Sequence, residues 1–173
     1  MKSIILNGNG CTVFNANGDI IYRIDNYNCK CNTEVYLMDL RGSVLFTILK
    51  KKFRLLGRWE GYRWTPAEKT KPWFQVRRKL CRILQKNQTC CEVTVVVLDN
   101  KETIWYRMES WVSKSACKIV DQAGRLVAVI QKKQTSSGIL LGDDVWTLEI
   151  EPNVDHLLIM GLVIVCGFIN HNM

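Results

Sequence analysis

Residues 152–173 read P-N-V-D-H-L-L-I-M-G-L-V-I-V-C-G-F-I-N-H-N-M, and every residue from Leu157 to Ile169 is apolar or glycine. A helix that is apolar on all sides must be surrounded by protein or by lipid. A helix of this length spans about 20 Å, less than the roughly 30 Å hydrocarbon core of a bilayer, and such short runs are more often buried core helices. The segment therefore predicts a buried core helix, with a membrane segment and a buried strand as alternatives.

The residues before the apolar run carry signals for the start of a helix. Pro152 suits a first turn, Asn153 is a candidate cap, and Asp155 places a carboxylate near the positive end of the helix dipole. These signals favour the helix, and the rest of the chain must then enclose it.

The composition is that of one globular domain over residues 1–173. The chain is 47% apolar with only three prolines, which excludes disordered and fibrous proteins. The start, M-K-S-I-I-L-N-G-N-G, has too short an apolar stretch for a secretory signal. We therefore expect a cytoplasmic protein with no transmembrane segment, in which the eight cysteines are free thiols. Since the chain has two histidines and no C-x-x-C, we expect neither a metal nor a cofactor.

A strand-turn-strand unit recurs along the chain. It reads V-F-N-A-N-G-D-I-I-Y-R-I at 13–24, Y-L-M-D-L-R-G-S-V-L-F-T-I at 36–48 and K-I-V-D-Q-A-G-R-L-V-A-V-I at 118–130. In each copy Asp or Asn opens the turn through its side chain, and a glycine three residues later accepts the positive φ that closes a tight hairpin. A degenerate copy at 93–108 keeps Asp99 and Asn100 but lacks the glycine.

Four hairpins account for about eight strands, and further candidates lie at 59–64, 73–79, 110–113 and 145–151. Loops are expected at 65–72, 85–89 and 134–138, because these segments are rich in proline or polar residues. Many short antiparallel strands close most economically as a barrel, which removes their edges, and a barrel can enclose one apolar helix. We therefore predict a mainly β fold, a closed antiparallel β-barrel around the buried C-terminal helix.

Basic residues are concentrated in the middle of the chain. Residues 50–82 contain twelve Lys or Arg against two acids, whereas no Lys or Arg follows Lys133. Clustered Lys and Arg on a strand surface attract phosphate-rich partners. The candidate anion- or lipid-binding residues are Lys50, Lys51, Lys52, Arg54, Arg77, Arg78, Lys79, Lys132 and Lys133. The competing interpretation is a solvated face that improves solubility.

Two other classes of function are weaker alternatives. Phe53, Trp59, Tyr62 and Trp64 alternate with basic residues, so these rings could stack on nucleic-acid bases while Arg54, Arg58 and Arg63 contact phosphates. The same charges could instead bind an acidic protein, in which case the chain is an interaction scaffold with unknown protein partners. We assign no catalytic residue, because the G-x-G at 8–10 lacks a third glycine and no nucleophile-base motif occurs.

Several segments together resemble the plant LURP-one-related family. They include G-N-G-C-T-V-F-N-A-N-G, V-Y-L-M-D-L-R-G-S-V-L-F-T-I-L-K-K-K, C-K-I-V-D-Q-A-G-R-L-V-A-V-I-Q-K-K and G-D-D-V-W-T-L-E-I-E-P-N-V-D-H-L-L-I-M-G-L-V. They keep their order and spacing over nearly the whole chain. The resemblance implies the tubby C-terminal-like fold, a closed barrel of about twelve strands around a hydrophobic C-terminal helix, which phospholipid scramblases share.

The resemblance also implies a function. The family has no established enzymatic chemistry, at least one member is linked to defence against pathogens, and tubby relatives bind phosphoinositides. We therefore expect a non-enzymatic binding or signalling module that docks peripherally on anionic phospholipid, at the plasma membrane or in the nucleus. Family members usually carry further residues before the segment that matches residues 1–10, so we expect that an N-terminal strand is lacking and a barrel edge is open.

Overall fold

The computed structural model describes residues 2–7, 10–29, 32–51, 58–63, 71–79, 88–96, 102–111, 116–135, 137–142 and 145–169. The strands are β1 (Lys2–Asn7), β2 (Gly10–Phe14), β3 (Ile20–Cys29), β4 (Asn32–Met38), β5 (Val44–Lys51), β6 (Arg58–Arg63), β7 (Phe74–Lys79), β8 (Gln88–Val96), β9 (Thr103–Trp111), β10 (Ala116–Asp121), β11 (Leu126–Lys132) and β12 (Val145–Ile150), and they are followed by the helix α1 (His156–Ile169).

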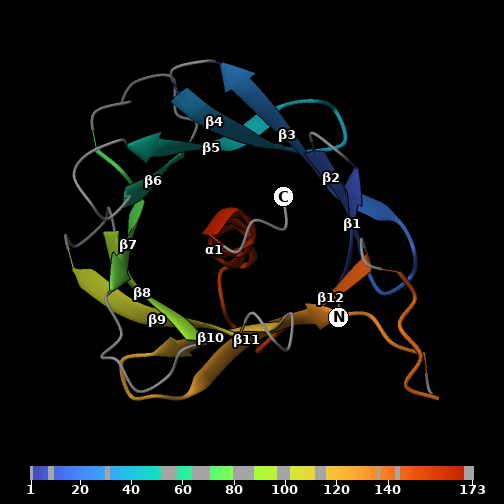
Figure 1. The fold of residues 1–173 in the computed structure, drawn as a ribbon. Helices are drawn as coiled ribbons and strands as arrows, with labels where there is room; N and C mark the ends of the chain where they lie inside the picture. Colours follow the sequence, from blue (N-terminus) through green and yellow to red (C-terminus); the bar gives the residue numbers. More distant parts are fainter. Residues whose placement is uncertain are drawn as a thin grey trace.

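Each strand pairs antiparallel with the strands before and after it in the chain, and the ring of strands surrounds α1 (Figure 1). The first strand, β1, lies between β2 and β12 and pairs with both, so the order of pairing returns to its start as a barrel. The predicted mainly β class, with antiparallel strands and one C-terminal helix, is confirmed. The open edge expected beside residues 1–10 is not found among the described strands, because β1 is paired on both sides.

The three tight turns predicted from the repeat are present. In the turn after β4, Oδ1 of Asp39 accepts hydrogen bonds from the backbone N–H groups of Arg41 and Ser43 at 2.9 and 2.8 Å. Gly42 has a φ of 81°, which suits a residue without a Cβ. The same side-chain bonds form from Asn15 and Asp121 in the other two copies. The degenerate copy at Asp99 and Asn100 lies outside the described residues.

Two local predictions are wrong. Residues 110–113 were expected to form a separate strand, but Ser110 and Trp111 are the end of β9. Residues 85–89 were expected to form a loop, but Gln88 and Thr89 open β8 and pair with Trp111 and Ser110. In both cases the pairing partner, which local composition does not reveal, extends the strand. The expected loop at 65–72 lies mostly outside the described residues.

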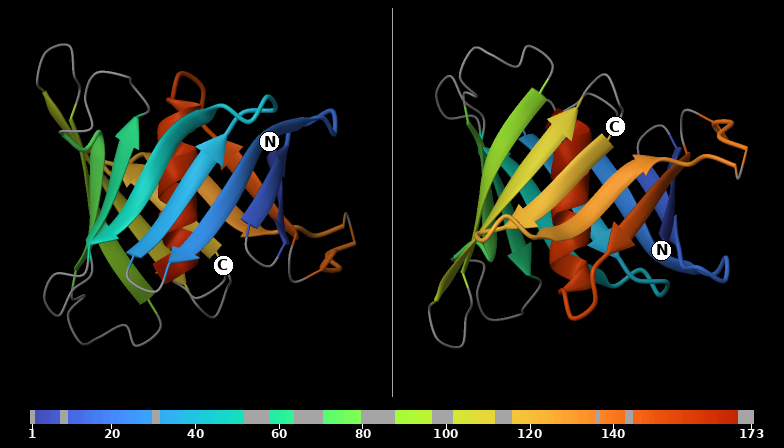
Figure 2. Two further views of the ribbon diagram at one scale, coloured as in Figure 1. Left: turned by 90° about the horizontal axis from the view of Figure 1, so that it is seen from above. Right: turned by 90° about the horizontal axis from the view of Figure 1, so that it is seen from below.

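The apolar C-terminal segment forms the buried helix that its sequence predicts. All residues of α1 from Leu158 to Cys166 are buried, and Figure 2 shows the helix running along the inside of the barrel. Within the described residues, no helix is long and apolar enough to cross a bilayer. The helix occupies the interior because its side chains have apolar neighbours on every side.

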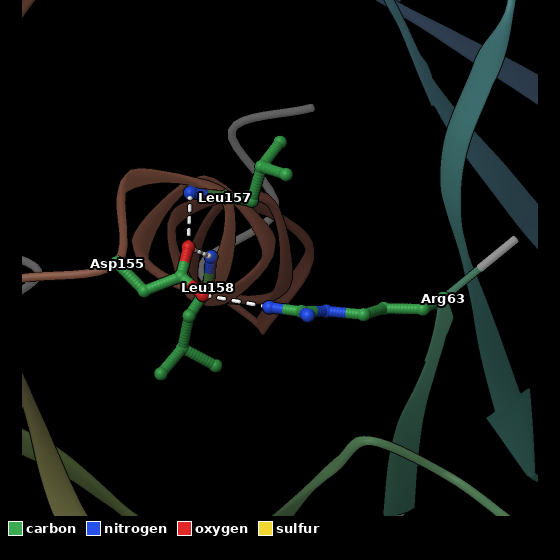
Figure 3. Close-up of polar contacts among 4 residues, drawn as sticks. All are labelled: Arg63, Asp155, Leu157 and Leu158. Atoms are coloured by element: carbon green, nitrogen blue, oxygen red, sulfur yellow. Dashed lines mark hydrogen bonds and ion pairs between the residues drawn. The ribbon is translucent and has the colours of Figure 1, made fainter. Parts of the chain in front are cut away.

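The cap of α1 is Asp155, not the predicted Asn153. Asp155 Oδ1 accepts hydrogen bonds from the backbone N–H groups of Leu157 and Leu158 at 2.9 and 3.2 Å, which satisfies two donors of the first turn (Figure 3). Asn153 has a φ of 63° and lies in the preceding turn. The other carboxylate oxygen of Asp155 accepts from Arg63 on β6 at 2.7 Å, so this side chain also ties the helix to the wall.

Phe74 packs between two glycines that are far apart in the sequence. A Cβ on Gly61 of β6 would lie 2.1 Å from the Phe74 ring, and a Cβ on Gly161 of α1 would lie 2.8 Å from it. Phe74 is fully buried and meets Phe46 edge-on, with 6.3 Å between ring centroids. The absence of side chains at both glycines therefore lets the helix pack closely against β6 and β7.

We predict that Gly61→Ala lowers the free energy of unfolding by about 2 kcal/mol, since overpacking of a filled core typically costs about 1–3 kcal/mol. Phe74→Leu should relieve the clash, so the double variant should lose less stability than the sum of the two single variants. Urea denaturation of all three proteins measures this coupling. Gly42→Ala is the control, because its cost comes only from a positive φ of 81° with no atom within 4 Å. Additive effects at Gly61 and Phe74 would contradict the packing described.

We predict that Asp155→Ala lowers the free energy of unfolding by about 1–2 kcal/mol, because it removes both the cap and the ion pair. Asp155→Asn retains a capping oxygen and removes only the ion pair, in which both side chains are about two-fifths exposed. It should therefore cost about 0–1 kcal/mol. Thermal denaturation of the two variants separates the contributions, and equal losses would show that the ion pair, not the cap, holds the helix.

Candidate functional site

The described candidate residues lie at one end of the barrel. Strands β5, β7, β9 and β11 point in the same direction, because each is antiparallel to the strand between it and the next. The ends of β5, β7 and β11, with their lysines and arginines, therefore lie together; we call this the basic end. The tight turns after β2, β4 and β10 lie at the opposite end, which we call the turn end.

The helix relates the two ends to each other. At the start of β6, Trp59 stacks on Phe168 near the end of α1, with 5.2 Å between centroids. At the end of β6, Arg63 meets Asp155 at the start of α1. The helix thus ends at the basic end. Since the carbonyl terminus of a helix carries a partial negative charge, this arrangement favours nearby cations.

A row of cations crosses the outer wall near the basic end. Lys51 of β5 is the direct cross-strand neighbour of Arg58 on β6, and Arg58 is the direct neighbour of Arg77 on β7. Direct neighbours project from the same face of a sheet. Because Trp59 and Val76, which alternate with these residues, are buried in the core, the row faces outward. We call Lys51, Arg58 and Arg77 the basic row.

Part of the charge of the basic row is compensated within the fold. Glu60 is only 3% exposed, and its carboxylate lies 2.5 Å from Arg58 and 3.9 Å from Lys51. It also accepts a hydrogen bond from the Tyr62 hydroxyl at 2.6 Å. Two cations beside one buried carboxylate leave the cluster with a net positive charge, and Arg77 adds a third, exposed cation.

The Glu60 carboxylate affects the pKa of the Tyr62 phenol. Burial and, next, the hydrogen bond to Glu60 raise the pKa of Tyr62 from 10.0 to about 12. Both effects favour the neutral phenol, because the phenolate would lose hydration and would face the Glu60 carboxylate. Tyr62 therefore stays a hydrogen-bond donor throughout the physiological pH range.

In the alternation of side chains along β5 and β7, Lys50 and Arg78 are on the inner face of the wall, opposite to the basic row. Lys50 is the neighbour of Trp59 across β5 and β6, and its ammonium lies 5.3 Å from the centroid of the indole ring. Arg78 is the neighbour of the buried Cys91, yet its own side chain is exposed at the end of β7. These two side chains therefore belong to the mouth of the barrel at the basic end.

Lys132 and Lys133 lie at the same end but on the opposite side of the barrel. Lys132 is the cross-strand neighbour of Trp146 on β12, and Figure 1 places β11 and β12 across the helix from β5, β6 and β7. The nine candidates thus do not form a single patch. Lys52 and Arg54 lie outside the described residues, and the side chain of Lys79 is also not described.

The nucleic-acid hypothesis requires exposed rings beside the arginines. Trp59 is 4% exposed and stacks on the core helix, so its faces are not available to a base. The hydroxyl of Tyr62 is bound to Glu60. Phe53 and Trp64, the other two rings, lie outside the described residues. Of the two described rings of this segment, Trp59 therefore supports the barrel wall, whereas Tyr62 is only partly buried.

The predicted anion-binding set did not include Glu60, and it did not include Arg58, which was considered only in the nucleic-acid alternative. Arg58 stands next to Trp59, and Glu60 follows at the next position; in a strand, this alternation places the two charges on the same face and the indole on the other. That signal was present in the sequence. What the sequence does not contain is the register that aligns Arg58 with Lys51 and Arg77.

The described thiols and acids are not clustered as the ligands of a metal ion would be. No group of three or more His, Cys, Asp or Glu residues there could hold a metal ion. Burial raises the pKa of the Cys11 thiol to about 12. A hydrogen bond with Cys166 and then burial raise the pKa of the Cys117 thiol. These thiols are protonated at neutral pH, which suppresses their nucleophilicity.

A sequence profile of the LURP-one-related family matches residues 1–167. The chain belongs to the LURP-one-related family. The resemblance seen in the sequence segments is thereby confirmed.

Individual LURP-one-related proteins of Arabidopsis thaliana are similar over nearly the whole chain. Protein LURP-one-related 11 is 44% identical over 175 residues, which cover 98% of this chain and 75% of that protein. Protein LURP-one-related 4 is 41% identical over 173 residues, again 98% of this chain and 75% of the relative. These matches support the plant origin that the resemblance implies.

A crystal structure of another protein from Arabidopsis thaliana has the same fold. The two structures superpose with a TM-score of 0.67 at 18% sequence identity, over 98% of this chain and 90% of the other. At this identity the likeness concerns the fold alone.

We predict that Glu60→Gln lowers the pKa of Tyr62 from about 12 but leaves it above the ordinary value, because burial remains. For the phenol, a folded-state pKa above the unfolded value stabilises the protein below pH 10, and this contribution is lost as pH rises through the folded-state pKa. The variant should therefore lose less stability between neutral and alkaline pH than the wild type does.

An alkaline titration of phenolate absorbance measures the pKa, and Tyr62→Phe identifies the signal of this residue. Urea denaturation at neutral and at alkaline pH measures the change in stability. A pKa that does not move in Glu60→Gln would show that burial alone holds the phenol neutral.

Proposed function

We propose that this LURP-one-related protein is a non-enzymatic module that docks its basic end on anionic phospholipid membranes, phosphoinositides included. The observation that carries the proposal is the alignment of Lys51, Arg58 and Arg77 in one outward row, with Arg78 exposed beside it. The family resemblance supports a binding or signalling role in plant defence, exercised peripherally at the plasma membrane.

The row favours a surface over a small ligand. Its cations come from three adjacent strands, and strands lie about 4.8 Å apart, so the charges spread along the wall instead of converging on a pocket. A membrane presents many phosphates in a plane and does not require convergence. Each Lys or Arg near an anionic surface contributes about 1 kcal/mol, which salt screens.

Glu60 limits this attraction and fixes its geometry. By pairing with Arg58 at 2.5 Å, it holds the guanidinium against the wall and reduces the net charge of the row. The proposal therefore implies moderate, salt-sensitive binding to anionic membranes. Tight recognition of one headgroup would require several side chains that donate hydrogen bonds to the same phosphate, and so point toward one another.

We predict that Lys50→Glu, Arg77→Glu and Arg78→Glu together reduce binding to phosphatidylserine- and phosphoinositide-containing vesicles about tenfold or more. The reason is that each reversal replaces an attraction of about 1 kcal/mol with a repulsion. Lys51 and Arg58 stay unchanged, so the ion pairs of Glu60 survive. The measurement is co-sedimentation with these vesicles and with neutral phosphatidylcholine vesicles, at low and at physiological salt.

The matched control carries the same change in net charge at the turn end, as Arg23→Glu, Arg41→Glu and Lys71→Glu, three residues that are also exposed. It should bind anionic vesicles nearly as the wild type does. Equal losses in both triple variants would mean that only the net charge matters, and unchanged binding in the basic-end variant would overturn the proposal. Displacement of the vesicles by single-stranded RNA would instead make nucleic acid the partner to pursue.

A further inference from the structure

We propose that a hairpin at the basic end, described over residues 133–135 and 137–141 with the apolar side chains Ile139, Leu140 and Leu141, inserts into the lipid bilayer. This inference rests on the proposed docking on anionic membranes and adds a second, hydrophobic means of attachment. We call these three side chains the apolar tip.

Three consecutive large apolar residues of the apolar tip face solvent. Ile139 is 66% exposed, Leu140 is 48% exposed and Leu141 is 50% exposed. The other exposed large apolar residues that the structure describes are Leu40 in the turn after β4, Leu126 on β11, and Ile104 and Trp105 on β9, where adjacent side chains point to opposite faces. Scattered single residues of this kind are normal on a protein surface, but a continuous group marks an interaction site.

The hairpin that carries the apolar tip has a defined shape. The N–H of Leu141 donates to the carbonyl of Lys133 at 3.0 Å, and that of Thr135 donates to the carbonyl of Ile139 at 2.8 Å. A turn closes it, with the N–H of Gly138 bonded to the carbonyl of Thr135 at 2.9 Å. The hairpin projects away from the barrel wall in all three ribbon views (Figures 1 and 2).

These internal hydrogen bonds matter for insertion into lipid. A backbone group that enters the apolar part of a bilayer without a partner costs several kcal/mol. In the hairpin, the N–H groups of Leu141 and Ile139 are both bonded within it, the latter to Thr135 Oγ1 at 3.1 Å. These two N–H groups can therefore enter the upper acyl region without losing a hydrogen-bond partner. A convex tip also suits a deformable bilayer better than a flat protein surface.

Charge complementarity identifies the partner as an anionic membrane. The hairpin leaves the barrel directly after β11, so it starts at the basic end, with Lys132 and Lys133 at its base. The basic row and the apolar tip lie at the same end of the barrel, on opposite sides of α1. Because the hairpin projects from the side of the barrel away from the basic row (Figure 2), the cations that accompany the tip to a membrane are Lys132 and Lys133.

The two means of attachment respond differently to salt. The attraction of the basic row is screened as ionic strength rises, with a Debye length of about 3 Å at 1 M salt. Burial of apolar side chains is not screened in this way. The inference therefore concerns the part of binding that survives high salt.

The test compares vesicle partitioning of three proteins at physiological and at high salt. The hairpin variant is Ile139→Ser, Leu140→Ser and Leu141→Ser. The matched control is Leu40→Ser, Ile104→Thr and Leu126→Thr, which removes three exposed apolar side chains of the turn end. Vesicles contain phosphatidylcholine with phosphatidylserine, and thermal denaturation verifies that each variant is folded.

We expect the partition coefficient of the hairpin variant at high salt to fall about ten- to a hundredfold, because the variant can no longer bury three half-exposed Leu or Ile side chains in the bilayer. The control should partition as the wild type does. A gain-of-function variant, Leu140→Trp, should partition more strongly, because tryptophan favours the membrane interface.

Other outcomes separate this inference from the proposal on which it rests. If the hairpin variant binds as the wild type does while the basic-end charge reversals abolish binding, the inference fails and the proposed function stands. If the wild type binds no vesicle, both fail. Loss of partitioning in both apolar variants overturns the inference, because any exposed apolar residue would then suffice. A dimer that the hairpin variant abolishes in light scattering would assign the tip to a second copy of the chain instead.

Discussion

The structure depends on the need to bury a helix that is apolar all round. Ile159, Met160, Leu162 and Ile164 are fully buried and project in different directions around α1, so no single sheet face could cover them. Only a wall that surrounds the helix removes all of this surface from water. The pairing of β1 with both β2 and β12 provides that wall from one end of the chain to the other.

At its two ends, the helix is held by polar and aromatic contacts with the wall. At the start, Asp155 satisfies N–H groups of the first turn and binds Arg63, whose guanidinium also lies 3.9 Å from the centroid of Trp73. At the other end, Trp59 stacks on Phe168 and carries Lys50 above its ring. Near each end of α1, a cation of the wall thus lies over a tryptophan ring. These contacts fix the depth of the helix in the barrel, which its uniform apolar surface cannot do alone.

Features encoded by a few neighbouring residues could be predicted from the sequence. The Asp39 turn is one, because its side chain bonds the backbone two and four residues later and Gly42 supplies the positive φ. The core helix is another, since its apolar run needs no knowledge of its neighbours. Features that depend on register or on distant contacts could not. The fit of Phe74 between Gly61 and Gly161, and the start of β8 at Gln88, require partners that local sequence does not name.

The candidate site follows the same division. The charges within residues 50–82 were visible in the sequence, but the sequence could not show that Lys51 and Arg58 share the carboxylate of Glu60, or that Lys132 stands across the barrel from them. Residue type alone grouped nine cations into one candidate site. The strand order places them on two sides of the basic end. The alternation of side chains along β5 places Lys51 on the outer face of the wall and Lys50 on the inner face, at the mouth of the barrel.

The filled interior also constrains where any partner can bind. Because the side chains of α1 meet the inward residues of the wall, a ligand in the barrel would have to displace part of the core, at a cost comparable with that of disrupting packed side chains, about 2–5 kcal/mol each. Binding is therefore confined to the outer wall and the two ends. At the turn end, the described turns after β2, β4 and β10 are short, and their Asp and Asn side chains are bonded to their own backbone. The basic end has exposed cations and a projecting apolar hairpin. A partner could bind these side chains without disrupting the core.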